Sequence, residues 1–235
     1  MTASSSSRRS SRTPTSWRRI IRHQFAGLFI VIEAPRGLDL RPYSDALYTA
    51  LRSRIPHCLR VSDLGETPLA KTISPLLDEH PDEVPLRSES QILLRAAARA
   101  ELVHHHILPA LRSGSLVLCE RFLWSTQVYQ GTSIRDYELI RTLHRFTTDD
   151  LTPDYTFYLD RAEPIPSTQP LSAISHKDAF MRLASSDPTA CSILDAAPSP
   201  LLVADAMTTR LQQHFEPLLT SLSAPICSPH AAVKE

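Results

Sequence analysis

Glycine and lysine are both scarce in this chain, with five glycines and three lysines among 235 residues. The glycines Gly27, Gly37, Gly65, Gly114 and Gly131 are never five positions apart, and no lysine directly follows a glycine. A loop that cradles phosphate needs glycines at that spacing, which let backbone N–H groups approach the oxygens, and a lysine that neutralises them. The sequence therefore excludes an intact loop of the Gly-x-x-x-x-Gly-Lys-Ser/Thr type.

Long apolar runs and closely spaced cysteines are also absent. No apolar stretch reaches the roughly 18 residues that a membrane helix needs, so we expect a soluble protein with no membrane partner. Cys58, Cys119, Cys191 and Cys227 lie far apart with no Cys-x-x-Cys pair. This pattern is typical of buried free thiols in a reducing, cytoplasmic compartment. The balanced formal charge of +0 gives no overall attraction to nucleic acid, which we do not expect as a partner.

Acidic residues are missing before Glu33, whereas six arginines and many serines occur in residues 1–24. This composition predicts a disordered basic arm. Three interpretations of the arm remain open. It is a transit peptide for organellar import, because such segments are rich in Arg and Ser and poor in acids; or an electrostatic contact to an anionic partner; or a solvated tail without a role.

Hydrophobic periodicity predicts alternating strands and helices over residues 25–221, followed by a tail over 222–235. The expected strands are 25–33, 57–62, 116–119, 155–159 and 192–195, and the expected helices are 43–54, 67–77, 90–111, 136–147 and 201–219. Continuous apolar strands that alternate with helices are typical of a parallel sheet covered on both faces. We therefore predict an α/β fold, a three-layer α/β/α domain around a five-stranded parallel sheet.

Two helices carry more detailed expectations. In helix 43–54, Leu47, Leu51 and the following Ile55 are expected to form a buried face. In helix 136–147, the expected apolar face consists of Leu139, Ile140, Leu143 and Phe146.

Polar side chains follow the buried strand 116–119. Glu120, Arg121, Ser125 and Thr126 come directly after it, and ligands of open α/β sheets bind outside the carboxyl ends of the strands. We therefore expect a binding site there. The histidine run 104–106 predicts no metal site, because consecutive helical residues point about 100° apart and do not converge on one ion.

One segment near this site resembles a known family. Ser125–Gly131, which reads STQVYQG, is similar to the Ser-Thr-x-Ala-Tyr-Gln-Gly motif of thymidylate kinases. Weaker matches occur in the family's order at Ala97–Arg99, Pro109–Leu111, Glu120–Phe122 and Pro153–Asp160, and the resemblance covers roughly residues 26–220. It implies a P-loop NTPase-like fold, ATP and Mg²⁺ as cofactors, a dTMP-like nucleotide as substrate, and a dimer formed through the long Ala-rich helix.

The resemblance also assigns roles on the acceptor side. Arg121 would hold the monophosphate, with Glu120 beside it as the second catalytic residue. The residues that would surround the nucleoside are Arg99 and Thr126 at the pyrimidine edge, Ser125 and Gln130 nearby, and Tyr129 against the ribose 2′ position. Arg95 stands where the family has a base-stacking aromatic. It shares a helix face with Arg99, so the two arginines are expected to face an anion or a base near Arg121. The alternative is a surface ion pair of Arg95 with Glu89 or Glu101.

The donor side departs from the family pattern. In the loop 33–42 only Glu33 and Gly37 match; Ala34 and Asp39 replace glycines, Leu40 replaces the lysine, and Arg41 and Pro42 replace the hydroxyl pair that would hold magnesium. The residues left to face ATP are Glu33, Arg36, Gly37 and Arg41. Pro35 removes an N–H and the Asp39 carboxylate repels phosphate, and Ser62 replaces a further phosphate-binding arginine. The lid segment 161–175 has one arginine, Arg161, with Arg182 following it.

Three functions remain open from the sequence. The first is a pseudoenzyme, weakly active or inactive, that retains dTMP-type nucleotide binding. The second is an active dTMP kinase of dTDP biosynthesis, converting dTMP and ATP to dTDP and ADP through a non-standard donor site made by Arg36, Arg41 and Arg121. The third is a structural or regulatory dimer partner, as a homodimer or with an active paralogue.

Overall fold

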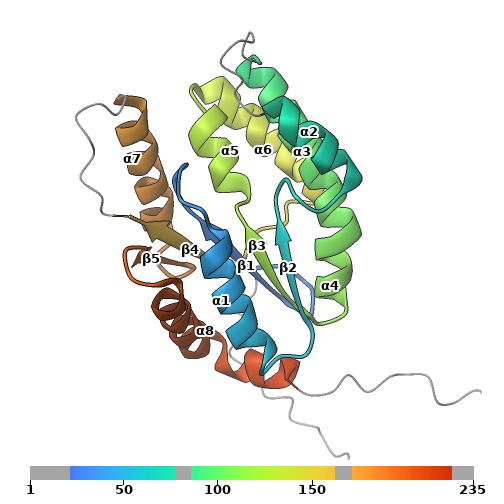
Figure 1. Cartoon of the computed structure of the whole chain (residues 1–235). Helices are drawn as coiled ribbons and strands as arrows, with labels where there is room; N and C mark the ends of the chain where they lie inside the picture. Colours follow the sequence, from blue (N-terminus) through green and yellow to red (C-terminus); the bar gives the residue numbers. More distant parts are fainter. Residues whose placement is uncertain (1–21, 78–85, 162–170, 224–235) are drawn as a thin grey trace, which may run out of the picture.

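A single parallel sheet forms the centre of the computed structural model, which describes residues 22–77, 86–161 and 171–223 (Figure 1). The strands are β1 (Leu28–Glu33), β2 (Cys58–Ser62), β3 (Leu116–Glu120), β4 (Tyr155–Asp160) and β5 (Cys191–Asp195). They lie in the order β2-β3-β1-β4-β5 and all pairs are parallel. The predicted five-stranded parallel α/β sheet is confirmed.

Helices cover both faces of this sheet (Figure 1). One face carries α1 (Arg41–Arg52) and α8 (Pro200–Leu222), which pack together. The other face carries α2 (Pro68–Leu77), α3 (Ser88–Leu102), the π-helical turn η2 (Val103–Ile107), α4 (Leu108–Arg112), α5 (Leu123–Gln130), α6 (Ile134–Thr148) and α7 (Leu171–Ser186). The molecule therefore has the three layers expected from the alternation of apolar strands and helices.

Strand β1 is buried along its whole length. Its side chains alternate between the layers: Leu28, Ile30 and Ile32 join the core under α1 and α8, whereas Phe29 and Val31 join the core under η2 and α4. Burial on both faces explains why β1 reads as a continuous apolar run. The predicted apolar face of α1 (Leu47, Leu51) and Ile55 is confirmed, since all three side chains are buried.

The long helix predicted over 90–111 is present but not uniform. Its α-helical hydrogen bonding gives way to the π-helical turn η2 before α4. Pro109 has no N–H to donate to the preceding turn, and a wider turn accommodates that gap. His104 and His105 are exposed on η2, and no group of three metal-ligating side chains occurs in the described part of the chain.

The predicted apolar face of α6 is wrong in part. Phe146 is 83% exposed, and the buried ridge is Ile140, His144 and Thr148 instead. These three residues follow each other at four-residue spacing and form one stripe of the helix. The error arises because His144 counts as polar in a periodicity argument, whereas its ring is buried and bonds the carbonyl of Leu151 at 3.0 Å.

Three of the four cysteines lie in the described residues, and Cys58, Cys119 and Cys191 are free thiols as predicted. Cys227, residues 1–21 of the predicted basic arm 1–24, and most of the segment 161–175 lie outside the described residues. Within 22–77, 86–161 and 171–223, no helix is long and apolar enough to cross a membrane.

Candidate nucleotide site

Three backbone N–H groups at the loop between β1 and α1 are already hydrogen-bonded within the protein. The N–H of Arg36 donates to the Tyr129 hydroxyl at 2.6 Å, the N–H of Leu38 to the carbonyl of Pro35 at 3.4 Å, and the N–H of Arg41 to the Asp39 carboxylate at 3.0 Å. A phosphate cradle requires these groups to be unbonded and to converge on the ligand. The loop therefore offers a phosphate few of the donors that a cradle would supply.

Leu40 shows why the lysine position no longer faces a ligand. Its side chain is buried and belongs to the core under α1 and α8. Its carbonyl accepts the first N–H groups of α1, and Pro42 lies at the first helical positions, where a missing N–H costs nothing. The end of the loop thus serves as a hydrophobic helix start.

Arg121 points its guanidinium into the same loop. Nη1 donates to the carbonyl of Ala34 at 2.5 Å, and Nη2 lies 3.3 Å and 3.4 Å from the carbonyls of Pro35 and Leu38. The Arg121 backbone has a left-handed φ of 62°, held by its N–H bond to the carbonyl of Ile32 at 2.8 Å. A non-glycine residue in that region is uncommon and is kept there by its surroundings. The loop therefore presents oxygens to a cation where a phosphate cradle presents N–H groups to an anion.

Glu33 anchors the start of α5 from the end of β1. Its carboxylate is buried and accepts the N–H of Phe122 at 2.9 Å, the N–H of Ser125 at 3.2 Å and the Ser125 hydroxyl at 2.6 Å. Burial raises the pKa of Glu33 even though the Ser125 hydroxyl and Arg121 favour its charged form. Glu33 and Ser125 thus position the segment that carries Arg121, and both side chains are used in doing so.

Arg99 is held by Asp63, which directly follows β2, and by Thr126 of α5. Nε and Nη2 donate to the two oxygens of Asp63 at 2.8 Å and 2.5 Å, and Nη2 also reaches the Thr126 hydroxyl at 2.8 Å. Both ionic side chains are almost fully buried. Burial opposes the charge of Arg99, but the charge and hydrogen bonds of Asp63 act together with the charge of Glu33 to raise the pKa of the arginine overall. Thr126 and Arg99 therefore meet, as expected, around a carboxylate that the sequence analysis did not single out.

Arg95 lies one helical turn before Arg99 and is partly buried. Its Nε is enclosed and has no hydrogen-bond partner. Burial lowers the pKa of Arg95, and the charges of Arg99, Arg36 and Arg121 lower it further against the pull of Asp63. The surface pairs proposed for Arg95 are not formed, because Glu89 pairs with Arg87 and Glu101 with His105. Four guanidinium groups therefore gather around one region.

Tyr129 and Gln130 border this region from α5. The guanidinium carbon of Arg36 lies 4.6 Å from the centre of the Tyr129 ring, a cation–π contact. Burial raises the pKa of the Tyr129 hydroxyl. The Gln130 amide donates to Gln91 at 3.0 Å, and its buried carbonyl oxygen has no partner.

Glu120 faces away from the arginine cluster, toward α1 and β2. Its Oε1 accepts Arg60 Nη1 at 2.7 Å and also the Ser44 hydroxyl. Sequence reasoning missed Ser44, Arg60 and Asp63. The signal for Arg60 was available in the two-residue repeat of β2, because Ser62 is in register with Glu120 and Arg60 lies on the same side of the strand as Ser62.

Magnesium does not fit the residues at the start of α1. Arg41 and Pro42 offer no side-chain oxygen, and the nearest hydroxyl, Ser44, is bonded to the Arg41 carbonyl at 3.1 Å and to Glu120. Mg²⁺ requires oxygen ligands in octahedral geometry at about 2.1 Å. The magnesium implied by the resemblance therefore has no ligand set in this part of the site.

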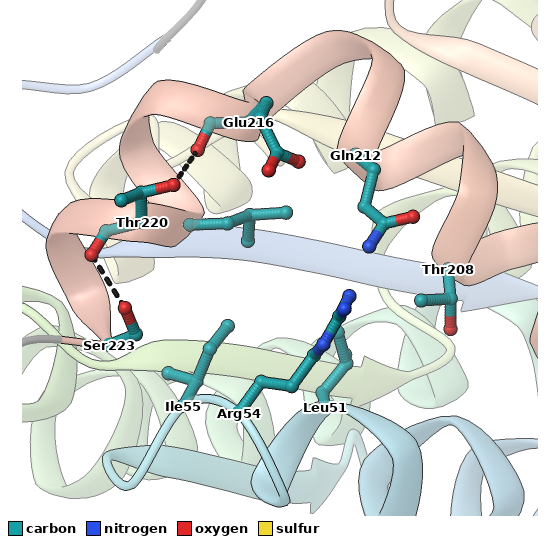
Figure 2. Close-up of a pocket in the computed structure, with 9 residues that line it drawn as sticks. Leu51, Arg54, Ile55, Thr208, Gln212, Glu216, Thr220 and Ser223 are labelled. Atoms are coloured by element: carbon teal, nitrogen blue, oxygen red, sulfur yellow. Dashed lines mark hydrogen bonds between the residues drawn. The ribbon is translucent and has the colours of Figure 1, made fainter.

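A separate hollow of about 130 Å³ lies between α1 and α8 (Figure 2). It is lined by Leu51, Arg54 and Ile55 from the end of α1 and by residues of α8 such as Gln212 and Glu216. Because α1 starts at the loop after β1 and ends at this hollow, the hollow lies at the opposite end of the sheet from the arginine cluster. A phosphate donor bound in this hollow would therefore be too far from the arginine cluster to react with a ligand held there.

The order of the strands and the polar cluster at the carboxyl edge of the sheet identify a P-loop NTPase-like α/β domain. The sequence pattern of the family "Thymidylate kinase" matches residues 43–207, beginning just after the loop. The chain belongs to the thymidylate kinase family.

Individual relatives agree with this assignment. A thymidylate kinase of Thermomicrobium roseum is 36% identical over 195 residues, which cover 76% of this chain and 91% of that one. One of Pseudomonas syringae pv. tomato is 38% identical over 135 residues, which span 57% of this chain and only 64% of the relative. The crystal structure of thymidylate kinase from Ehrlichia chaffeensis superposes with a TM-score of 0.67 at 26% identity, covering 79% of this chain and 99% of that one.

Proposed function

We propose that this chain is a thymidylate kinase homologue with little or no phosphotransfer activity that retains a site for a dTMP-like nucleotide. The observation that carries the proposal is the bonding of Arg121 to the carbonyls of Ala34, Pro35 and Leu38. Phosphoryl transfer depends almost wholly on positioning and on neutralising charge at the phosphates. A loop that binds a cation through its oxygens works against both requirements.

The acceptor side supports retained nucleotide binding. Arg36, Arg95, Arg99 and Arg121 interact electrostatically, and the buried acids among them are Asp63, bonded to Arg99, and Glu33, bonded to the start of α5. Positive charge on partly buried side chains such as Arg95 and Arg121 attracts a phosphate group more strongly than the same charge in water.

A coupled ATP-consumption assay with dTMP tests the loss of activity. Turnover above about 1 per second is ordinary for an enzyme and would instead establish the active kinase with a non-standard donor site. Turnover at least about 100-fold below that value is the expected result. Binding of dTMP is measured separately by thermal shift, so that a lost acceptor site and a lost donor site give different results.

One observation favours a second role, as a dimer partner. Leu69 and Leu76 of α2 and Leu93 of α3 are exposed on two helices that pack against each other. Exposed apolar side chains on neighbouring helices are typical of interaction surfaces when they form one patch. We expect the solution mass to correspond to a dimer, alone or with an active homologue, and Leu76→Glu with Leu93→Glu to reduce it to that of one chain. A monomer for the unmodified protein under both conditions contradicts this role.

A further inference from the structure

A compact ion cluster joins α1, β2 and β3 next to the loop. Arg60 Nη1 donates to Oε1 of Glu120 at 2.7 Å and lies 3.3 Å from the Ser44 hydroxyl, while Nη2 lies 3.2 Å from Asp45. The Ser44 hydroxyl donates to the same Glu120 oxygen. The side chains of Arg60 and Glu120 are only 23% and 15% exposed, so water screens this contact weakly.

The register of the sheet explains how Arg60 reaches Glu120. Ser62 pairs directly with Glu120 and Arg60 with Leu118, so Arg60 is one strand repeat behind the carboxylate and on its side of β2. A long arginine spans that gap, whereas the short Ser62 side chain beside Glu120 leaves the space open. The cation of the cluster is therefore supplied two residues before the position where the family carries its arginine.

The oxygen atoms that a divalent cation would need as ligands at this edge of the sheet are already hydrogen-bonded within the cluster. Glu120 Oε1 already accepts two hydrogen bonds, and Ser44 is held by Glu120 and by the Arg41 carbonyl. A metal ion that bound this oxygen would have to displace the guanidinium of Arg60, which makes a charge-assisted bond, and the two cations would repel each other.

We propose that Arg60 is the built-in cation of this site and occupies the carboxylate and hydroxyl that would otherwise hold a divalent metal. Nucleotide binding by this chain is accordingly independent of Mg²⁺. The independence from Mg²⁺ rests on the proposed nucleotide site, whereas the role of Arg60 rests on the ion cluster and is tested without measuring phosphate transfer.

Titration with Mn²⁺, followed by electron paramagnetic resonance, tests this assignment directly. We expect the unmodified protein to bind no Mn²⁺ through Glu120. Any Mn²⁺ binding elsewhere is expected to be weak, with a dissociation constant above about 1 mM. Arg60→Met keeps the apolar stem and removes the charge. We expect it to bind Mn²⁺ at least about tenfold more tightly, and the added substitution Glu120→Gln to abolish that gain.

The matched control is Arg52→Met on α1, because Arg52 contacts Tyr48 and not Glu120. It removes one positive charge without removing a contact of Glu120 and is expected to leave Mn²⁺ binding unchanged. Tight Mn²⁺ binding by the unmodified protein that Glu120→Gln abolishes would overturn the proposal, as would equal gains in the Arg60 and Arg52 variants. The first of these results needs no Arg60 variant to fold.

Discussion

Arg121 is the residue on which the site is centred. Its backbone is held in a left-handed conformation by β1, and its guanidinium is bonded to the loop that follows β1. In the proposed function the same guanidinium faces a nucleotide monophosphate, so the side chain links the loop to the ligand.

Replacement of Arg121 tests that link. Arg121→Ala is expected to abolish the thermal shift caused by dTMP and to lower the free energy of unfolding by about 1–3 kcal/mol, because three carbonyls lose a charged donor. The exposed Arg145→Ala on α6 serves as the control and should change neither quantity. An unchanged dTMP shift in a folded Arg121→Ala protein removes the acceptor site from the account.

Arg95 offers a gain of function at the residue scale. Arg95→Phe supplies the aromatic surface that the family uses for the base and removes a guanidinium that three other arginines repel. Stacking on an aromatic contributes about 1–3 kcal/mol per base, so dTMP should bind roughly tenfold or more tightly by calorimetry. Weaker dTMP binding by Arg95→Phe would show that Arg95 itself contacts the ligand.

At this scale, the sequence predicted which side chains lie in the site more reliably than it predicted their hydrogen-bond partners. Arg99, Arg121 and Thr126 were expected together from the family resemblance, and Arg95 because it shares a helix face with Arg99; the structure brings these side chains together. Asp63 was not expected, because nothing in its local sequence separates a buried acid paired with Arg99 from a solvated one.

At the scale of the element, the loop 34–40 acts as one unit. Carbonyls of the loop accept hydrogen bonds from Arg121, the N–H groups of Arg36 and Leu38 are already bonded, and the side chain of Leu40 belongs to the core. No single substitution reverses all three features.

Leu40→Lys therefore restores the family residue without restoring catalysis. We expect no measurable increase in ATP turnover, together with a loss of about 2 kcal/mol or more in the free energy of unfolding, because an ammonium group enters a buried position. Leu40→Met, which keeps volume and polarity, is the stability control. A large increase in turnover for Leu40→Lys would mean that the loop is closer to a working cradle than its hydrogen bonds indicate.

Elements were predicted unevenly for a physical reason. Strands β1 and β3 are buried on both faces and read as apolar runs, so their existence was clear from the sequence. Helices α5 and α7 were not predicted. Helix α5 buries Ser125, Thr126 and Gln130, whose burial depends on partners in other elements, and this makes its apolar stripe weak.

The stability of the whole molecule is expected to vary with pH because a titratable side chain is buried in the helix layer that contains α6. His144 lies on the buried face of α6, where burial and the charge of Arg99 lower its pKa from 6.5 to about 4. The unfolded chain therefore binds more protons than the folded chain between these pH values, and stability falls as the pH drops from 6.5 toward 4.

The size of that effect is measurable by denaturant unfolding. His144 contributes up to about 3 kcal/mol of this loss, and His144→Gln should flatten the stability profile between pH 6.5 and pH 4 by about that amount. The exposed His105→Gln is the matched control and should leave the slope unchanged. A variant profile as steep as that of the unmodified protein would mean that other groups cause the acid sensitivity.

Fold and family were predictable at this scale because parallel sheets impose a strong apolar pattern and the motif at Ser125–Gly131 is specific. The hydrogen bonds of the site were not predictable. Arg121 bonds to the loop and Arg60 bonds to Glu120 through contacts between residues 60 or more positions apart in the sequence.

Calorimetric titration of the unmodified protein with dTMP, ATP and Mg²⁺, each separately, tests the central claim most directly. The account predicts saturable heat with dTMP at one site per chain and none with ATP, whether or not Mg²⁺ is present. Saturable ATP binding that requires Mg²⁺ and is lost when the loop residues 34–40 are replaced would contradict it.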